Sequence, residues 1–121
     1  DEISWVNGGH QPALLRDKNG KFEQVESAAP PMGVIQQKNK SLYKINRTKL
    51  NGKRFYAFTD GLSESLDSKG NEIGIEGSIK IIEKNFNDDV SKQLSNIAKD
   101  VEKSSGKNKL SDDLTLIAIG K

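Results

Sequence analysis

Two consecutive stretches of the sequence carry apolar residues at helical spacing, and this feature constrains the fold more than any other. Ile75, Ile79, Ile82 and Phe86 recur at steps of four, three and four, and the same spacing returns over residues 90–101. Each stretch predicts an amphipathic helix with one apolar stripe. A single stripe must be buried against another layer, and we expect that layer to be a sheet formed by the rest of the chain.

We expect these two helices to pack on that sheet through four residues, with their lysines left in solvent: Ile79, Ile82, Leu94 and Ile97. Asn87 or Asp88 is the expected cap of the second helix, because short polar side chains accept hydrogen bonds from the first free main-chain N–H groups. Ser104-Ser105-Gly106 is expected to end it.

The sequence also contains six segments that are typical of β-strands, with period-two alternation or short apolar runs. The turn Asp17-Lys18-Asn19-Gly20 joins the second and third into a hairpin. The fifth segment is nearly continuously apolar over residues 55–58, which predicts a central strand. The segments are Ile3–Asn7, Ala13–Arg16, Phe22–Glu26, Leu42–Arg47, Arg54–Thr59 and Leu114–Ile119.

This order of strands, two helices and a last strand predicts an α+β fold with helices laid on a mainly antiparallel sheet. The length of 121 residues fits one domain, residues 1–121. The chain begins at Asp1 without a methionine, already inside a predicted strand. We therefore expect a piece of a longer protein.

Composition removes several classes of chemistry. The sequence has no cysteine, which excludes disulfides, thiolate catalysis and thiolate zinc sites and fits a reducing cytoplasm. His10 is the one histidine, so an imidazole-rich metal site is excluded as well. Any metal must be held by oxygen ligands.

The charge pattern argues against nucleic acid and membranes as partners. Net charge is +2 with both signs interspersed. The lysine-rich stretch Lys38–Lys53 is interleaved with apolar residues, which favours the solvated face of a strand over a nucleic-acid site. No apolar run approaches the roughly 20 residues of a membrane span.

Two acidic sites lie beside the most apolar strands: Asp60 follows one, and Asp112-Asp113 precedes another. If those strands are antiparallel neighbours, the carboxylates meet at one edge of the sheet, within reach of one magnesium or manganese ion. Gly61 would permit the turn that presents Asp60. The alternative is an ordinary Asp-Gly turn and an ordinary loop, which spacing alone does not exclude.

Three segments together resemble the sporulation stage II protein E-like branch of the type 2C metal-dependent serine/threonine phosphatases. That branch shows Asn-Ala-Gly-His near a strand end, Thr-Asp-Gly-hydrophobic-x-Glu after another strand, and Asp-Asp-hydrophobic-Thr before the last strand. Pro31-Met32-Gly33 stands where the branch has a Pro-Leu-Gly-like turn. The matching segments are Val6–Leu15, Phe58–Ser65 and Ser111–Leu116.

The resemblance implies a type 2C fold, complete as an α-β-β-α sandwich, and two magnesium or manganese ions that activate a water to attack a phosphoserine or phosphothreonine. It assigns Asp60 and Asp112 as metal ligands. Asp113 would support the ligands without touching the metal, and Glu64 could hold a metal-bound water, with a surface position as its alternative. Gly61 would belong to the same supporting set, at the turn that presents Asp60. No side chain would serve as the acid or base.

His10 could act as an acid or base, but in its Asn-Gly-Gly-His context we expect a structural ring bonded to the backbone. The family also needs an aspartate from an earlier Gly-Asp motif, and the sequence has no Gly-Asp pair. The chain thus resembles the carboxy-terminal half to two thirds of the domain. Alone it should be a poor phosphatase and a weak metal binder.

The leading hypothesis is a parent protein-serine/threonine phosphatase acting in bacterial signalling on a phosphorylated regulator, such as an anti-sigma-factor antagonist. A non-catalytic interaction module that keeps the fold is the first alternative, and a plain α+β scaffold is the second. Loss of upstream strands would leave an open sheet edge, through which the chain could self-associate.

Overall fold

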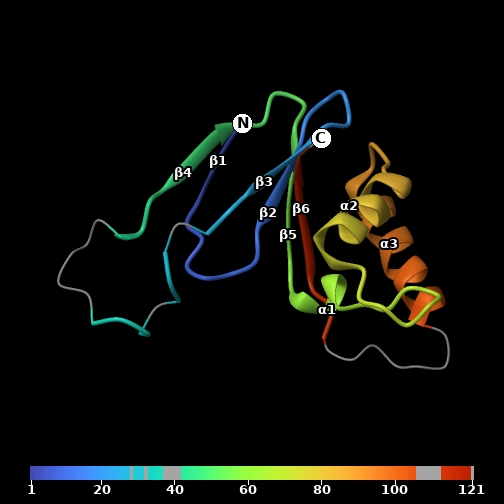
Figure 1. Ribbon diagram of the computed structural model, residues 1–121. Helices are drawn as coiled ribbons and strands as arrows, with labels where there is room; N and C mark the ends of the chain where they lie inside the picture. Colours follow the sequence, from blue (N-terminus) through green and yellow to red (C-terminus); the bar gives the residue numbers. More distant parts are fainter. Residues whose placement is uncertain (28, 32, 37–41, 106–112, 121) are drawn as a thin grey trace.

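The computed structural model describes residues 1–27, 29–31, 33–36, 42–105 and 113–120. Figure 1 shows the elements in their arrangement. In chain order they are β1 (Glu2–Trp5), β2 (Ala13–Arg16), β3 (Phe22–Val25), β4 (Asn46–Lys49), β5 (Arg54–Phe58), α1 (Asp60–Ser63), α2 (Gly74–Lys84), α3 (Val90–Ser105) and β6 (Leu116–Gly120).

The described strands form two antiparallel sheets, which confirms the α+β prediction. The larger sheet has the order β3-β2-β5-β6, and β1 pairs with β4 in the smaller one. β5 lies between β2 and β6, as its apolar run predicts, and Phe58 at its end pairs with Leu116 at the start of β6. The two most apolar strands are therefore antiparallel neighbours.

Helices α2 and α3 cover one face of the larger sheet, and the β1–β4 pair lies on its other side (Figure 1). Strand β2 contributes side chains to the cores on both faces of the sheet, because successive side chains of a strand point to opposite faces. Leu14 joins the helix-side core with Tyr56 and Ile82, whereas Leu15 joins a second cluster packed against Trp5 of β1.

The apolar stripes of both helices are confirmed, with one difference of degree. Ile82 and Ile97 are fully buried, and Ile79 packs partly buried against the same core. Leu94 is only half-buried. The neighbouring Gln93 is fully buried instead, where its side chain bonds Arg54 and the hydroxyl of Tyr56.

Several predicted boundaries shift. The fourth strand is Asn46–Lys49, not Leu42–Arg47, and its partner is β1. Residues 60–63 form a one-turn helix where we expected a plain turn. The side-chain cap of α3 is Asp89, not Asn87 or Asp88: its Oδ1 accepts from the N–H groups of Ser91 and Lys92 at 3.0 and 3.2 Å.

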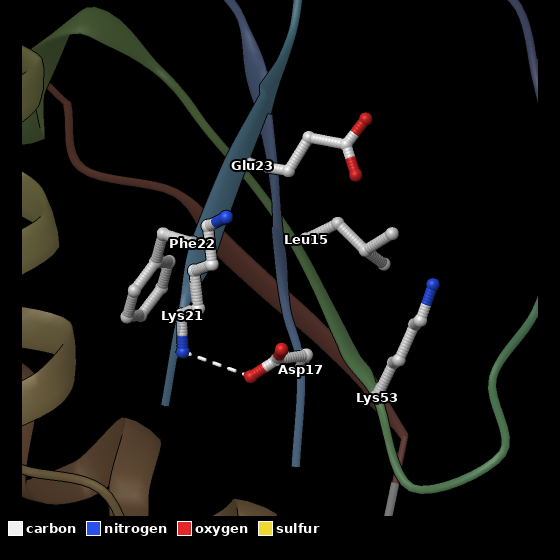
Figure 2. A pocket seen from close by; sticks show the side chains of 6 residues that line it. All are labelled: Leu15, Asp17, Lys21, Phe22, Glu23 and Lys53. Carbon is white, nitrogen blue, oxygen red and sulfur yellow. Dashed lines mark hydrogen bonds between the residues drawn. The ribbon is translucent and has the colours of Figure 1, made fainter. Parts of the chain in front are cut away.

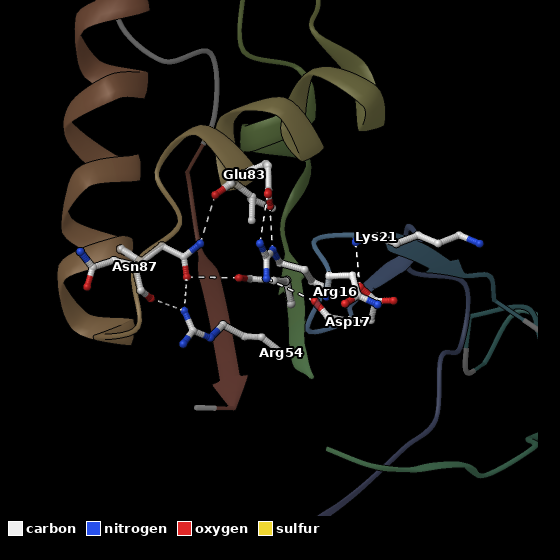
Figure 3. Close-up of polar contacts among 10 residues, drawn as sticks. Arg16, Asp17, Lys21, Arg54, Glu83 and Asn87 are labelled. Carbon is white, nitrogen blue, oxygen red and sulfur yellow. Dashed lines mark hydrogen bonds and ion pairs between the residues drawn. The ribbon is translucent and has the colours of Figure 1, made fainter. Parts of the chain in front are cut away.

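Buried Arg54 attaches the sheet to the loop between the helices (Figure 3). It is 1% exposed, and its guanidinium donates to the main-chain oxygens of Asn87 at 2.6 Å and Asp88 at 3.0 Å. A third bond, 2.7 Å long, goes to Oε1 of Gln93. Three oxygen acceptors thus compensate the burial of this charge at its two terminal nitrogens, whereas its Nε is buried with no hydrogen-bond partner among the described residues.

Arg16 makes a parallel attachment from β2. Its guanidinium forms a two-pronged ion pair with Glu83 of α2, at 2.7 and 3.0 Å (Figure 3). The ring of Phe86 lies 3.6 Å from the Arg16 guanidinium carbon and 4.9 Å from that of Arg54. Both cations thus contact the aromatic ring at the end of α2.

Candidate metal site at the end of strands β5 and β6

Thr59 joins the end of β5 to the start of β6. Its hydroxyl donates to the main-chain oxygen of Asp113 at 2.9 Å and accepts from the N–H of Thr115 at 2.9 Å. The main-chain N–H of Thr59 donates to the oxygen of Thr115 at 3.0 Å. These three bonds fix residue 113 beside the turn that follows β5.

Gly61 allows the main chain of α1 to lie very close to the main chain of Asp113. A β-carbon on Gly61 would lie 2.6 Å from the main-chain oxygen of Asp113 and 3.0 Å from its carbonyl carbon. Gly61 is buried in α1 and has an ordinary helical backbone. The glycine is therefore required by contact with residue 113, and not by a turn that needs a positive φ.

Asp60 is the first residue of α1 and is exposed to solvent at the end of β5. Asp112 falls outside the described residues, so its distance from Asp60 stays a prediction. Asp113, its neighbour in sequence, lies beside Gly61 and Thr59. Glu64 follows α1 and is exposed, and its main-chain N–H donates to the main-chain oxygen of Asp60 at 2.8 Å.

Sequence reasoning missed Gln11, which links the loop before β2 to both sides of Asp60. Its side-chain amide donates to the main-chain oxygen of Phe58. Its amide oxygen accepts from the hydroxyl of Ser63 at 3.0 Å. The residue follows the Asn-Gly-Gly-His motif directly, but that motif gives no indication of a partner 47 residues away.

His10 has the structural contact expected of it. Its Nδ1 lies 3.1 Å from the main-chain oxygen of Gln11, to which it donates when that nitrogen carries the ring proton. The ring is exposed.

Carboxylate oxygen is the correct donor chemistry for magnesium or manganese, and Asp60 presents one at the strand end. Such ions take about six oxygen ligands, and within the described ranges no three histidine, aspartate or glutamate side chains gather into a metal-binding group. The described residues thus fit part of a metal site.

Among the described residues, no helix is long and apolar enough to cross a lipid bilayer.

Figure 2 shows a hollow near the turn between β2 and β3. It is a cavity of about 340 Å³ next to the β2–β3 turn, lined by Leu15, Asp17, Lys21, Phe22, Glu23 and Lys53. Arg16 pairs with Arg54 at the start of β5, whereas Asp60 follows its end. This cavity is therefore separate from the candidate metal site.

The family model for stage II sporulation protein E matches residues 1–121, the whole chain. The chain belongs to the stage II sporulation protein E family. This membership accounts for the three motifs, and it agrees with Asp60 and residue 113 lying at one edge of the sheet. No curated protein sequence is significantly similar to this family member.

Solved structures show that the chain is similar to part of a larger fold. It is similar to the SiaA-PP2C domain of Pseudomonas aeruginosa, with a TM-score of 0.77, 16% identity, and coverage of 99% of this chain and 46% of that one. It is also similar to the RsbU and RsbW domains of Rv1364c from Mycobacterium tuberculosis, with a TM-score of 0.63, 23% identity, and coverage of 97% and 31%. The chain thus has part of the PP2C fold and spans less than half of either structure.

Proposed function

We propose that the chain forms the carboxy-terminal part of a metal-dependent phosphatase domain that hydrolyses phosphoserine or phosphothreonine on a bacterial signalling protein. The contact of Gly61 with the backbone of Asp113 carries this proposal. It holds the Asp60 turn against residue 113, the sequence neighbour of the second predicted ligand, Asp112. Family membership and the PP2C-like fold support the same activity.

Asp60 and Asp112 would hold magnesium or manganese in this site. Asp113 and Glu64 would lie behind them and orient the ligands or water through hydrogen bonds. The bound ions would lower the pKa of water and neutralise charge on the phosphoryl group. The chain's own part would be to fix the carboxylates, through the contacts of Thr59 and Gly61 with the main chain of Asp113.

A phosphorylated protein such as an anti-sigma-factor antagonist is the proposed substrate. Support comes from one structural neighbour, in which an RsbU domain shares a chain with an RsbW domain. A non-catalytic interaction module is the second candidate. The small number of metal-binding side chains among the described residues favours the interaction module. The presence of Asp60, Asp112 and Asp113 in the sequence favours the enzyme.

The deciding experiment is hydrolysis of a phosphoserine peptide with manganese. It compares this chain, the complete domain, and the complete domain carrying Asp60→Asn or, as the control, Asp88→Asn on the exposed helix loop. We expect activity only in the complete domain and its control. Full activity of the Asp60→Asn domain would place the site elsewhere, and an inactive complete domain would favour the interaction module.

A further inference from the structure

Gln11 reaches both sides of the turn that carries Asp60. Its side-chain amide contacts the oxygen of Phe58, the last residue of β5, and the hydroxyl of Ser63, the last residue of α1. Asp60 lies between these two points. We propose that Gln11 is a positioning residue that fixes the Asp60 carboxylate for metal binding, an inference that rests on the proposed function.

The orientation of the Gln11 amide follows from its partners. A main-chain carbonyl can only accept a hydrogen bond, so the NH₂ group must face Phe58. The amide oxygen is then left for the hydroxyl of Ser63, which also lies 3.1 Å from the main-chain oxygen of Asp60. One side chain thereby ties the strand end to the helix that follows.

Helix α1 needs such an external constraint. It has four residues, and Thr59 at its N-cap makes no side-chain capping bond. Isolated helices this short are not stable in water. The conformation of Asp60 therefore depends on contacts from outside the turn: Thr59 and Gly61 with residue 113 on one side, and Gln11 on the other.

Gln11 is itself held by the preceding motif. Its main-chain oxygen accepts from Nδ2 of Asn7 at 3.1 Å and lies at the same distance from Nδ1 of His10. Asn7 is 8% exposed, and its Oδ1 accepts from the N–H of His10 at 2.9 Å. The Asn-Gly-Gly-His segment thus holds the main chain of Gln11 in place. His10 has a structural role in this arrangement and does not need to transfer a proton.

The loop that contains this motif is held by contacts with Pro31 and Ser27. Gly9 has a φ of +82°, and a β-carbon there would lie 2.3 Å from the ring of Pro31. Its N–H donates to the hydroxyl of Ser27 at 2.7 Å, and that hydroxyl also bonds the oxygen of Asn7 at 3.1 Å. Because these contacts hold the loop in one conformation, the hydrogen bonds of Gln11 can hold α1 in a fixed position.

The test measures manganese binding to the complete domain by calorimetry, without substrate, together with the melting temperature in a chelator. Gln11→Met keeps the length of the side chain but removes both hydrogen bonds. Ser63→Ala removes one of them, and Gln24→Ala on β3, whose side chain is exposed, is the matched control. We expect Gln11→Met to weaken manganese binding about 10-fold, as loss of partners behind a ligand does.

We expect Ser63→Ala to weaken binding in the same direction, and the double variant to lose less than the product of the two single effects. Unchanged manganese affinity in both folded single variants would overturn the positioning role, and so would a lower melting temperature with unchanged affinity. Equal weakening in Gln24→Ala would overturn it too. If the wild-type domain binds no manganese, or Asp60→Asn binds it normally, the proposed function itself fails.

Discussion

The main-chain oxygen of Asp113 lies so close to the α-carbon of Gly61 that a β-carbon would come within 2.6 Å of it. This contact is between two backbones, so no side-chain rotation can relieve it. It fixes the separation between the end of β5 and the start of β6, and with it the spacing available to a ligand from each segment.

Gly61→Ala is therefore expected to destabilise the protein by about 1–3 kcal/mol, as overpacking does at a close-packed site. Alanine has the better helix propensity, so a purely local effect would have the opposite sign. Urea unfolding of the complete domain measures the change. Ser95→Ala, on the exposed face of α3, is the control, and equal stability of Gly61→Ala and wild type would show that the strands can separate freely.

The two helix residues Leu94 and Ile97 should differ in their response to truncation. Ile97 is 1% exposed, so Ile97→Ala should cost about 2–5 kcal/mol through lost burial and a cavity. Leu94 is half-buried, and Leu94→Ala should cost clearly less. Unfolding by urea compares the two. A larger loss for Leu94 would mean that the face of α3 toward the sheet is wrongly assigned.

Acid should weaken the β2–β3 turn through Asp17. Hydrogen bonds from the N–H groups of Lys21 and Asn19 hold the pKa of Asp17 below its ordinary value of 3.8. Its contribution to stability is therefore complete well above pH 3.8 and is lost as the pH falls through the lower folded-state pKa. We expect Asp17→Asn, which keeps an acceptor but cannot titrate, to lose less stability than wild type between pH 6 and 3.

The measurement is urea unfolding across that pH range. Glu23→Gln, an exposed carboxyl on the neighbouring strand, is the matched control and should follow wild type. Parallel curves for wild type and Asp17→Asn would show that the turn carboxylate contributes nothing to acid sensitivity.

Self-association of the isolated chain should proceed through β6. This strand lies at one end of the larger sheet, and its Ile117 and Ile119 are 51% and 42% exposed. Such an edge pairs readily with a second chain, and charged residues prevent it. We expect sedimentation velocity to show concentration-dependent dimers that Ile117→Lys removes. Ser95→Lys should leave them intact, and dimers that survive Ile117→Lys would place the interface elsewhere.

The sequence was sufficient for features that depend on local pattern. Helical spacing identified the buried faces of both helices, and the Asn19-Gly20 turn identified the hairpin. These features are local because periodicity and turn chemistry act over a few residues.

Features that depend on tertiary contact escaped prediction. The bond from Gln11 to Phe58 and the approach of Gly61 to Asp113 join residues about 50 positions apart, and no local pattern encodes either contact. The cap of α3 was missed for a different reason. Asn87, Asp88 and Asp89 are all good capping residues, and the choice depends on how Arg54 holds the preceding loop.

Strand β5 has a distinct attachment at each end, and this has a consequence for how the protein opens. Its first residue, Arg54, donates hydrogen bonds to the carbonyls of the helix–helix loop. The residue after its last, Thr59, is bonded to Asp113 and Thr115, just before β6. The helices cannot detach without breaking the hydrogen bonds of Arg54 to this loop and exposing the apolar core beneath them, which is costly. Amide hydrogens of α2, α3 and β5 should therefore exchange with solvent in one cooperative unit. Among the described strands β1 and β4 pair only with each other, so their amide hydrogens should exchange earlier.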